Sequence, residues 1–366
     1  MVAFAGVTDA KHTPRFAQVI GAGLIGGSIG AGLRAGGWHV TMCDVDDRRT
    51  ARAVEIGSAD RAGRDANAEI VFVAVPPSSV PDVALDALEA HPTSVVTDVA
   101  SVKRVIVDKV ASPRFIGGHP MAGSEQEGVD GSDADMFVGA TWVLTPGPAT
   151  DALAFAAVRT TIGSLGASVV ELDPWRHDQL VAMVSHVPHL TAATLMNLAA
   201  SSADEHSTLL RLAAGGFRDM TRIAAGGSAI WPDICVENQE AILQVIDRLR
   251  SSLGRVRDLV AAGDRPGLVE ILESAREARV NLPGRVVQSE TLVELRVVVS
   301  DRPGVLQEVT TLLGEMGVNI WDLEIAHSSE GDRGVLVMVI DSLTLDPVRR
   351  ALTSRGFQCS YRQVGS

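Results

Sequence analysis

The glycine-rich segment VIGAGLIGGSIGAGL, residues 19–33, constrains the fold of this chain more than any other feature. Gly21, Gly23 and Gly26 follow the apolar run 16–20 and open a stretch compatible with a helix. In a dinucleotide-binding turn the first glycine makes the tight turn, the second leaves room for phosphate oxygens, and the third lets the helix pack closely on the strand. The pyrophosphate then lies at the helix amino end. A glycine-rich turn in an ordinary α/β core is the alternative.

The residues after this segment indicate which dinucleotide would bind. The apolar run 38–44 ends in Asp44, eighteen residues after Gly26, where a carboxylate can accept hydrogen bonds from the ribose hydroxyls. Asp44 therefore favours NAD over NADP, although Arg48 and Arg49 could receive a 2′-phosphate instead. The predicted cofactor-binding residues are Gly21, Gly23, Leu24, Ile25, Gly26 and Asp44.

Composition limits the partners and the compartment. The chain has 366 residues with a formal net charge of −13, which argues against a surface that binds the phosphate backbone of nucleic acid. The first residues lack the basic region and long apolar core of a signal peptide, and no apolar stretch approaches the ~20 residues that span a bilayer. The three cysteines are scattered, which is typical of reduced thiols in a cytosolic protein. We therefore expect a cytoplasmic protein that binds neither nucleic acid nor a membrane.

Three patterns divide the chain into predicted domains. Residues 13–174 alternate apolar runs with helix-compatible stretches, which predicts a Rossmann-like α/β domain with a mostly parallel sheet. Residues 175–283 predict an all-helical domain, and residues 291–366 follow a βαββαβ order typical of a small ferredoxin-like module. The predicted strands of the first domain are the runs 16–20, 38–44, 69–75, 93–99, 114–118, 141–146 and 167–172.

One helical stretch in the second domain has an apolar stripe. The stripe is wide enough to be buried against a partner subunit as well as internally, and we therefore expect a homodimer. Its residues are Ile242, Val245, Ile246 and Leu249.

Two polar segments follow predicted strands of the first domain. His119 in GGHPMAGSE (117–125) lies just beyond one strand, at the carboxyl edge where open α/β sheets bind ligands. A lone histidine is also common as a satisfied structural residue. Ser101 in TDVASVK (97–103) leaves the preceding strand in the same way, and it can be a helix N-cap, a site residue, or both.

Two segments of the helical domain carry further candidates. In SHVPHL (185–190), His186 and His189 could share a helix face, although Pro188 disturbs that geometry. No HExxH motif or Cys/His cluster accompanies them, so we expect no metal. Arg218 and Arg222 lie in an otherwise apolar region, where each can be a surface residue or a bidentate clamp for a carboxylate.

The order of these motifs resembles the prephenate/arogenate dehydrogenase family of tyrosine biosynthesis. VIGAGLIGGSIG, TDVASVK, GGHPMAGSE, SHVPHL and FRDMTRIA, ending at Trp231, follow one another as in that family. DRPGVLQEVTTLLGEMGVNI (301–320) is similar to an ACT domain, a small regulatory module that binds amino acids. The resemblance implies an NAD-binding Rossmann-like domain, a helical dimerisation domain with the active site between the two, and a C-terminal ACT domain.

The resemblance also implies an activity and its residues. The activity is the NAD-dependent oxidative decarboxylation of prephenate to 4-hydroxyphenylpyruvate, with arogenate as the alternative substrate. His119 would be the catalytic base that accepts the C4 hydroxyl proton, and Ser101 would orient His119 and the nicotinamide. The implied substrate-binding residues are Arg222, His189, Glu125 and Trp231.

Two other functions are alternatives. A catalytically silent protein that senses NAD(H) would share the domains, but the retained His119, Ser101 and Arg222 argue against it. A β-hydroxyacid dehydrogenase also joins a Rossmann domain to a helical one, yet that family's usual catalytic lysine motif is not evident here.

The C-terminal module predicts feedback control. Its first strand leads into a Pro-Gly turn before a helix at Val305, and the amino end of a helix can bind the carboxylate of an amino acid. We expect L-tyrosine, or alternatively L-phenylalanine, as the effector; a module that only stabilises the dimer is the other interpretation. The predicted effector residues are Asp301, Gly304, Asn319 and Ile320.

Overall fold

The computed structural model describes residues 14–123, 126–203, 215–281, 292–300, 302–327 and 333–363. The chain divides into two compact units, Met1–Ser252 and Leu253–Ser366. Glu125 and Asp301, which the sequence predicts as site residues, lie outside the described residues.

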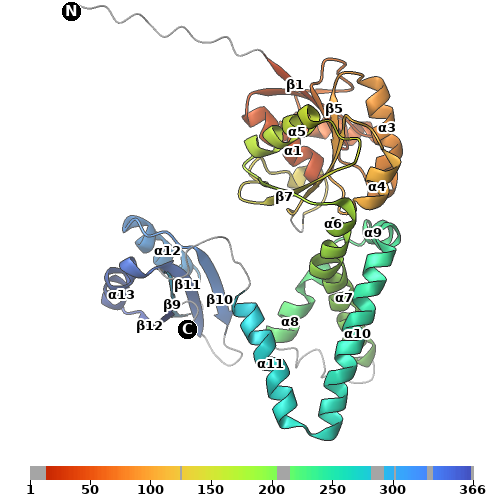
Figure 1. Ribbon diagram of the computed structural model, residues 1–366. Helices are drawn as coiled ribbons and strands as arrows, with labels where there is room; N and C mark the ends of the chain where they lie inside the picture. The colour runs from red at the N-terminus through yellow and green to blue at the C-terminus, as the bar shows by residue number, and fades with distance from the viewer. Residues whose placement is uncertain are drawn as a thin grey trace, which may run out of the picture. The chain divides into compact units, whose positions relative to one another are not determined.

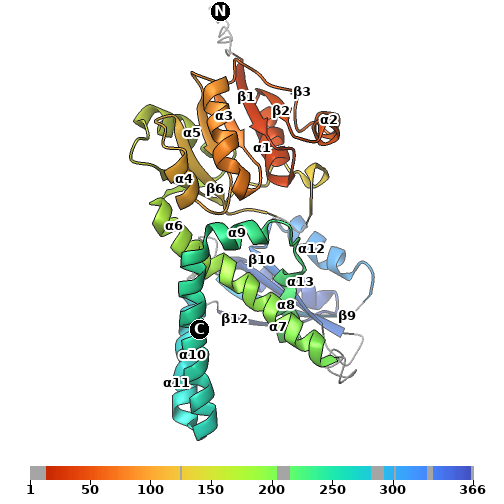
Figure 2. The same cartoon turned by 90° about the vertical axis from the view of Figure 1, so that its right-hand side faces the viewer.

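The first unit contains an eight-stranded sheet in the order β3-β2-β1-β4-β5-β6-β7-β8 (Figures 1 and 2). Neighbouring strands are parallel except β6 and β7, which are antiparallel. All seven predicted runs coincide with strands, and the two-residue β3 is an addition. The strands are β1 Arg15–Ile20, β2 Trp38–Cys43, β3 Arg61–Ala62, β4 Ile70–Val73, β5 Val95–Asp98, β6 Phe115–Pro120, β7 Thr141–Pro146 and β8 Ser168–Glu171.

Helices cover both faces of this sheet. Every residue of β4 is buried because its side chains alternate between two apolar clusters. Phe72 packs with Ile29 of α1 and Ile162 of α5, whereas Val71 packs with Ile106 of α4. This doubly wound arrangement confirms the predicted Rossmann-like class. The helices are α1 Leu24–Ala35, α2 Asp47–Glu55, α3 Val80–Ala90, α4 Arg104–Lys109 and α5 Ala152–Ser164.

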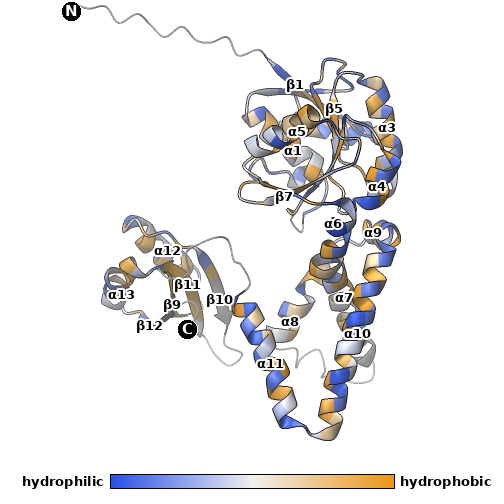
Figure 3. Ribbon diagram, viewed as in Figure 1, coloured by the Kyte–Doolittle hydropathy of each residue, from blue (hydrophilic) through white to orange (hydrophobic). Residues whose placement is uncertain are grey.

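The chain then becomes helical, as predicted. Ile242 and Val245 of α10 are buried against Ala182 and Val187, which joins α10 to the start of α7. Apolar and hydrophilic residues are interspersed along α10 (Figure 3). The elements are α6 Pro174–Val181, the π-helical turn η3 Ala182–His186, α7 Val187–Ala203, α8 Gly215–Thr221, the 3₁₀ turn η5 Arg222–Ala225, α9 Trp231–Glu237 and α10 Gln239–Ala262.

The second unit contains α11, Arg265–Val280, and a four-stranded antiparallel sheet in the order β10-β11-β9-β12. Leu295 and Val297 of β9 are buried with Leu313 of α12 and Val348 of α13, so the helices pack on one face of the sheet. The βαββαβ order is confirmed. Its elements are β9 Leu292–Ser300, α12 Val305–Glu315, β10 Asp322–His327, β11 Arg333–Asp341, α13 Leu345–Ser354 and β12 Gln358–Gln363.

Among the described residues, none of the helices combines the length and the apolar character that a membrane span needs. The cytoplasmic location and the boundaries 13–174, 175–283 and 291–366 stay predictions.

Candidate active site

His119 lies near the carboxyl end of β6, and only 8% of its surface is exposed. The sequence predicts it just beyond the strand, but β6 continues through Pro120 because β7 pairs with it there, with His119 opposite Val143. The parallel neighbour β5 ends at Asp98 on the same edge of the sheet. His119 is thus at the edge where open α/β sheets bind ligands.

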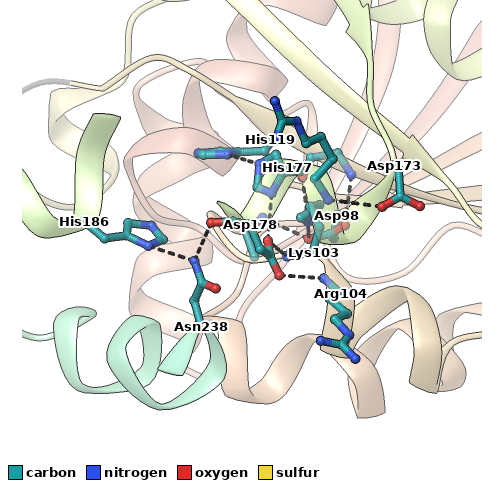
Figure 4. Close-up of polar contacts among 12 residues, drawn as sticks. Asp98, Lys103, Arg104, His119, Asp173, His177, Asp178, His186 and Asn238 are labelled. Atoms are coloured by element: carbon teal, nitrogen blue, oxygen red, sulfur yellow. Dashed lines mark hydrogen bonds and ion pairs between the residues drawn. The ribbon is translucent and has the colours of Figure 1, made fainter. Parts of the chain in front are cut away.

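A chain of polar side chains begins at the His119 ring (Figure 4). The Nδ1 atom of His119 is 2.8 Å from Nε2 of His177, and Nδ1 of His177 is 2.8 Å from Oδ1 of Asp178. His177 and Asp178 are buried in the first turns of α6, whose N-cap residue Asp173 accepts a hydrogen bond from the backbone N–H of Arg176. The first turns of α6 therefore hold His177 in place beside His119.

The strand residue before His119 is held by a buried ion pair. Lys103 and Asp98 are both inaccessible to solvent and pair with each other. The Lys103 ammonium group also donates to the carbonyl oxygen of Gly118 at 2.8 Å, and Asp98 accepts from the Gly118 N–H at 3.1 Å. A buried ion pair is tolerated when further hydrogen bonds satisfy both groups, as they do here.

Asp178 connects three elements around the site. Its Oδ1 and Oδ2 atoms accept hydrogen bonds from the backbone N–H groups of Lys103 and Arg104, at 2.8 and 2.9 Å. Its own carbonyl oxygen accepts from the side-chain amide of Asn238 at 2.9 Å. Asp178 thereby caps the start of α4 and ties it to α6 and to the residue before α10.

Two histidines of the helical part contact one tryptophan. The His189 ring stacks on Trp231 with 3.7 Å between ring centroids and an interplanar angle of 11°. The His186 ring meets Trp231 edge-on at 6.2 Å. Pro188 does not end the helix, because the π-helical turn leads directly into α7. Both rings therefore lie beside Trp231, as the shared-face hypothesis expects.

Burial sets the charge state of the histidines. Desolvation lowers the pKa of His119 well below its ordinary 6.5, and the nearby His177 and Lys103 lower it further. Burial also lowers the pKa of His177, and it lowers that of His186 to about 4. These imidazoles are neutral at pH 7, so His119 can accept a proton.

The glycine-rich loop lies at the same carboxyl edge, between β1 and α1. Gly21 has a φ of +110°, and a Cβ atom there would be 2.1 Å from the carbonyl oxygen of Ala74. A Cβ atom on Gly26 would be 2.0 Å from the Gly21 oxygen, whereas one on Gly23 would meet nothing within 4 Å. Gly23 therefore borders open space at the amino end of α1, where phosphate oxygens can approach.

Asp44 follows β2 and reaches back to this loop. Its Oδ2 atom accepts a hydrogen bond from the backbone N–H of Ala22 at 2.8 Å, and its Oδ1 atom accepts from the N–H of Asp46 at 2.9 Å. Arg48 is bound through two nitrogens by the Asp46 carboxylate, at 3.0 Å each. The carboxylate that is predicted to favour NAD is thus at the loop, and Arg48, one of the two candidate 2′-phosphate ligands, is already paired.

Family models match most of this chain. The model for the nucleotide-binding domain of prephenate dehydrogenase matches residues 29–171, that for its dimerization domain matches 173–274, and an ACT domain model matches 293–356. The prephenate dehydrogenase of Bacillus subtilis (strain 168) is 32% identical over 333 residues, which are 86% of this chain and 89% of that protein. The chain belongs to the prephenate dehydrogenase family.

Solved structures agree with the family. The prephenate dehydrogenase of Aquifex aeolicus, in complex with hydroxyphenyl propionate and NAD+, is 27% identical with a TM-score of 0.70, covering 75% of this chain and all (100%) of that one. The Synechocystis arogenate dehydrogenase is 32% identical with a TM-score of 0.65, covering 72% of this chain and 98% of that one. The predicted family and fold class are confirmed.

The structure brings only some of the residues expected from the prephenate dehydrogenase resemblance together. His189 and Trp231 are in contact, and Gly226 of the loop before Trp231 lies close to His189. Ser101 is not the N-cap of α4, which is Lys103, and the side chain within hydrogen-bonding distance of His119 is that of His177. Arg222 is exposed on η5, so its role stays a prediction.

Sequence reasoning missed His177, Asp178 and Asn238. An adjacent His-Asp pair three residues after Pro174, at the start of a helix, is a weak signal that gains meaning only once α6 is known to lie beside β6. Lys103 stands in the TDVASVK motif of the family, but lysines are rarely fully buried and nothing in the sequence predicts its pairing with Asp98.

The ACT domain of this family member contains the remaining predicted residues. Gly304 is the N-cap of α12 with a φ of +87°, which a glycine adopts without strain, and α12 begins at Val305 as expected. Asn319 is exposed and Ile320 packs partly against the core of this domain. Their role as effector ligands stays a prediction.

Proposed function

We propose that this chain is an NAD-dependent prephenate dehydrogenase that converts prephenate to 4-hydroxyphenylpyruvate with release of CO2. The observation that carries the proposal is the neutral, buried imidazole of His119 at the carboxyl edge of the sheet, held at Nδ1 by His177. Such a group suits a reaction that needs a proton acceptor close to a hydride acceptor. The family relationship supplies the substrate class.

The reaction requires little acid–base strength because it forms an aromatic ring. NAD, when bound, accepts the hydride from C4 of the substrate. His119 accepts the proton of the C4 hydroxyl as the carbonyl develops, and it returns that proton to the same oxygen when loss of CO2 from C1 makes the ring aromatic. His119 therefore ends the reaction in the same protonation state in which it began.

The residues of the glycine-rich loop fit a dinucleotide. Open space at Gly23 lies at the amino end of α1, a twelve-residue helix with no acidic residue in its first turn. Asp44 can accept hydrogen bonds from the adenosine ribose, and its charge opposes a 2′-phosphate. Leu24 and Ile25, in the first turn of the helix, complete the proposed binding residues.

The proposed substrate-binding residues come mainly from the helical part. Arg222 would bind a substrate carboxylate through its planar guanidinium group. Trp231 and His189 form a stacked pair that can present an imidazole N–H to the substrate side chain. Ser101 is proposed to orient His119 and the nicotinamide, and Glu125 to line the pocket.

A second substrate has support. Arogenate differs from prephenate only by an amino group on the side chain, and the similar Synechocystis protein is an arogenate dehydrogenase. The deciding experiment is steady-state NADH formation with prephenate and with arogenate, each with NAD and with NADP. Turnover of prephenate with NAD supports the proposal, turnover of arogenate alone replaces the substrate, and no turnover favours an NAD(H)-sensing protein.

The helical part supports a homodimer. A cavity of about 490 Å³ is lined mostly by apolar side chains, among them Met183, Val187, Leu195, Ile223 and Leu249. Ile246, beside this surface on α10, is 37% exposed, and the matching family model is described as a dimerization domain. Sedimentation at several protein concentrations tests the dimer.

The ACT domain is proposed to bind L-tyrosine or L-phenylalanine as a feedback inhibitor. The αL residue Gly304 is the N-cap of α12, whose first N–H groups can hold the effector carboxylate. A chain that ends at Gln288 should keep dehydrogenase activity and lose the inhibition. Inhibition that is unchanged in this shorter chain would assign it to the active site instead.

A further inference from the structure

The three-residue chain His119–His177–Asp178 has a definite order of donors and acceptors. Both oxygens of the Asp178 carboxylate accept backbone N–H groups, from Lys103 and from Arg104, so the carboxylate acts only as an acceptor. The remaining contact of Oδ1, to Nδ1 of His177 at 2.8 Å, is a hydrogen bond only if that nitrogen carries the proton.

The proton on Nδ1 decides the role of the other nitrogen of His177. The ring is 1% exposed, and its burial lowers its pKa, so it is neutral and its Nε2 atom has no proton. Nε2 of His177 can therefore only accept, and the proton in its 2.8 Å contact with His119 belongs to Nδ1 of His119. In a neutral His119 this leaves Nε2 as the atom with the free lone pair.

We propose that His177 and Asp178 are positioning residues that hold His119 in the tautomer with a proton on Nδ1 and a free Nε2. This inference rests on the proposed function, in which Nε2 of His119 takes the hydroxyl proton. When it does, Nδ1–H stays bonded to His177, and the new positive charge lies two hydrogen bonds from the Asp178 carboxylate. No further proton has to move.

The hydrogen bonds around His177 and Asp178 favour the same tautomer of His119. The backbone N–H of His177 donates to the carbonyl oxygen of Asp173 at 2.8 Å, which fixes the first turn of α6. Asn238 holds the Asp178 carbonyl oxygen, and Lys103 holds the strand residue before His119. The tautomer is thus set by a supporting shell of hydrogen bonds on rigid elements.

Two substitutions of one residue separate tautomer control from structure. In His177→Gln the side-chain oxygen can occupy the position of Nε2 and still accept from His119. In His177→Asn the amide reaches only the position of Nδ1, so it can donate to Asp178 but offers no acceptor to His119. His91→Asn is the matched control, because His91 is also buried and its Nδ1 has no hydrogen-bond partner among the described residues. His91 is the C-cap residue of α3 and precedes β5, whose other end carries Asp98.

We expect His177→Asn to lower kcat on the order of 10- to 100-fold with KM and NAD affinity nearly unchanged, because it loosens the orientation of the base. His177→Gln should recover most of this loss, and His91→Asn should not change kcat. Equal kcat for His177→Asn and the unchanged protein would overturn the proposal.

A spectroscopic measurement does not depend on activity. In the full chain labelled with ¹⁵N-histidine, the resonances of His119, assigned by their loss in His119→Asn, should show the proton on Nδ1 at neutral pH. A proton on Nε2 would overturn the tautomer assignment even in an active enzyme. If the protein does not oxidise prephenate or arogenate but His119 carries its proton on Nδ1, the proposed function fails while the tautomer assignment stands.

Discussion

The glycine-rich loop and the histidine cluster, defined here as His119, His177, Asp178, Lys103 and Asp98, lie at the same edge of one sheet but are built in opposite ways. The loop is a run of consecutive residues in which Gly21 and Gly26 leave no room for a Cβ atom and Gly23 borders open space, so its proposed binding depends on the backbone. The cluster gathers side chains from β5, β6, α6 and the residue before α4, and all five are buried. A local motif can be recognised in a sequence, whereas an assembled cluster becomes visible only in the fold.

The largest effect is expected on kcat, when His119 of the cluster is replaced. His119→Asn should lower kcat roughly 10²- to 10⁴-fold, the usual share of general acid–base catalysis, because an amide cannot accept the hydroxyl proton. The affinity for NAD, measured by calorimetry, should stay unchanged because the loop is intact. Near-normal turnover of His119→Asn would show that His119 is not the catalytic base and that the cluster takes no part in the proton transfer.

The next largest effect is expected on substrate binding by Arg222, which the helical part would contribute to the site. Arg222→Ala should raise KM for prephenate by the equivalent of about 2–4 kcal/mol, because a charged hydrogen-bonded pair is lost in ground state and transition state alike. Arg218→Ala is the matched control from the preceding turn. If the KM of Arg222→Ala stays within a factor of two, Arg218 becomes the candidate.

The loop offers a paired test in which two similar changes act on different properties. Gly21→Ala should destabilise the fold by at least ~1–3 kcal/mol, since φ is +110° and the new Cβ would meet the Ala74 oxygen. Gly23→Ala should leave the melting temperature nearly unchanged, because its φ is −97° and the space is open, but weaken NAD binding on the order of tenfold. Unchanged NAD affinity in Gly23→Ala would mean that the open space at Gly23 is not a ligand site.

The smallest effect is on the choice between NAD and NADP. Asp44→Ser should erode the preference for NAD, since it removes the carboxylate that is proposed to bind the ribose. Asp46→Ser keeps a capping residue at the start of α2 but frees Arg48, and it should raise the use of NADP severalfold at most, because exposed ion pairs are weak. Comparing kcat/KM for both cofactors in the two variants checks this. An unchanged protein that uses NADP as well as NAD would show that Arg48 or Arg49 dominates.

The contrast also explains what the sequence could and could not predict. The seven strands were predictable because parallel strands buried on both faces form continuous apolar runs, whereas β3 has only two exposed residues and leaves no such run. His119 was predictable from its place after an apolar run. His177 was not, because its partner is 58 residues away and the contact depends on how α6 packs against the end of β6.

Lys103 and Ser101 show the same limit at short range. Both lie in TDVASVK, yet the sequence pattern favours Ser101 as the capping residue. In the fold the cap of α4 is the carboxylate of Asp178, supplied from 74 and 75 residues away. Capping by a distant residue has no local signature.

The central claim, that a buried neutral imidazole accepts the substrate proton, is tested most directly by the pH dependence of kcat/KM for prephenate, which reports groups of the free enzyme. Because the pKa of His119 is lowered, the neutral form persists as pH falls, and activity is lost only when pH drops through that lowered pKa. The titratable groups that act on His119 from neighbouring elements are His177, Lys103 and His186, and Asp178 and Asp98 act in turn on His177.

We predict a flat profile from pH 8 down to about 6.5 and a fall through one ionisation below that value. The residual activity of His119→Asn should lack this fall. A limb with a midpoint above 6.5, or an acid limb that persists unchanged in His119→Asn, would contradict the account.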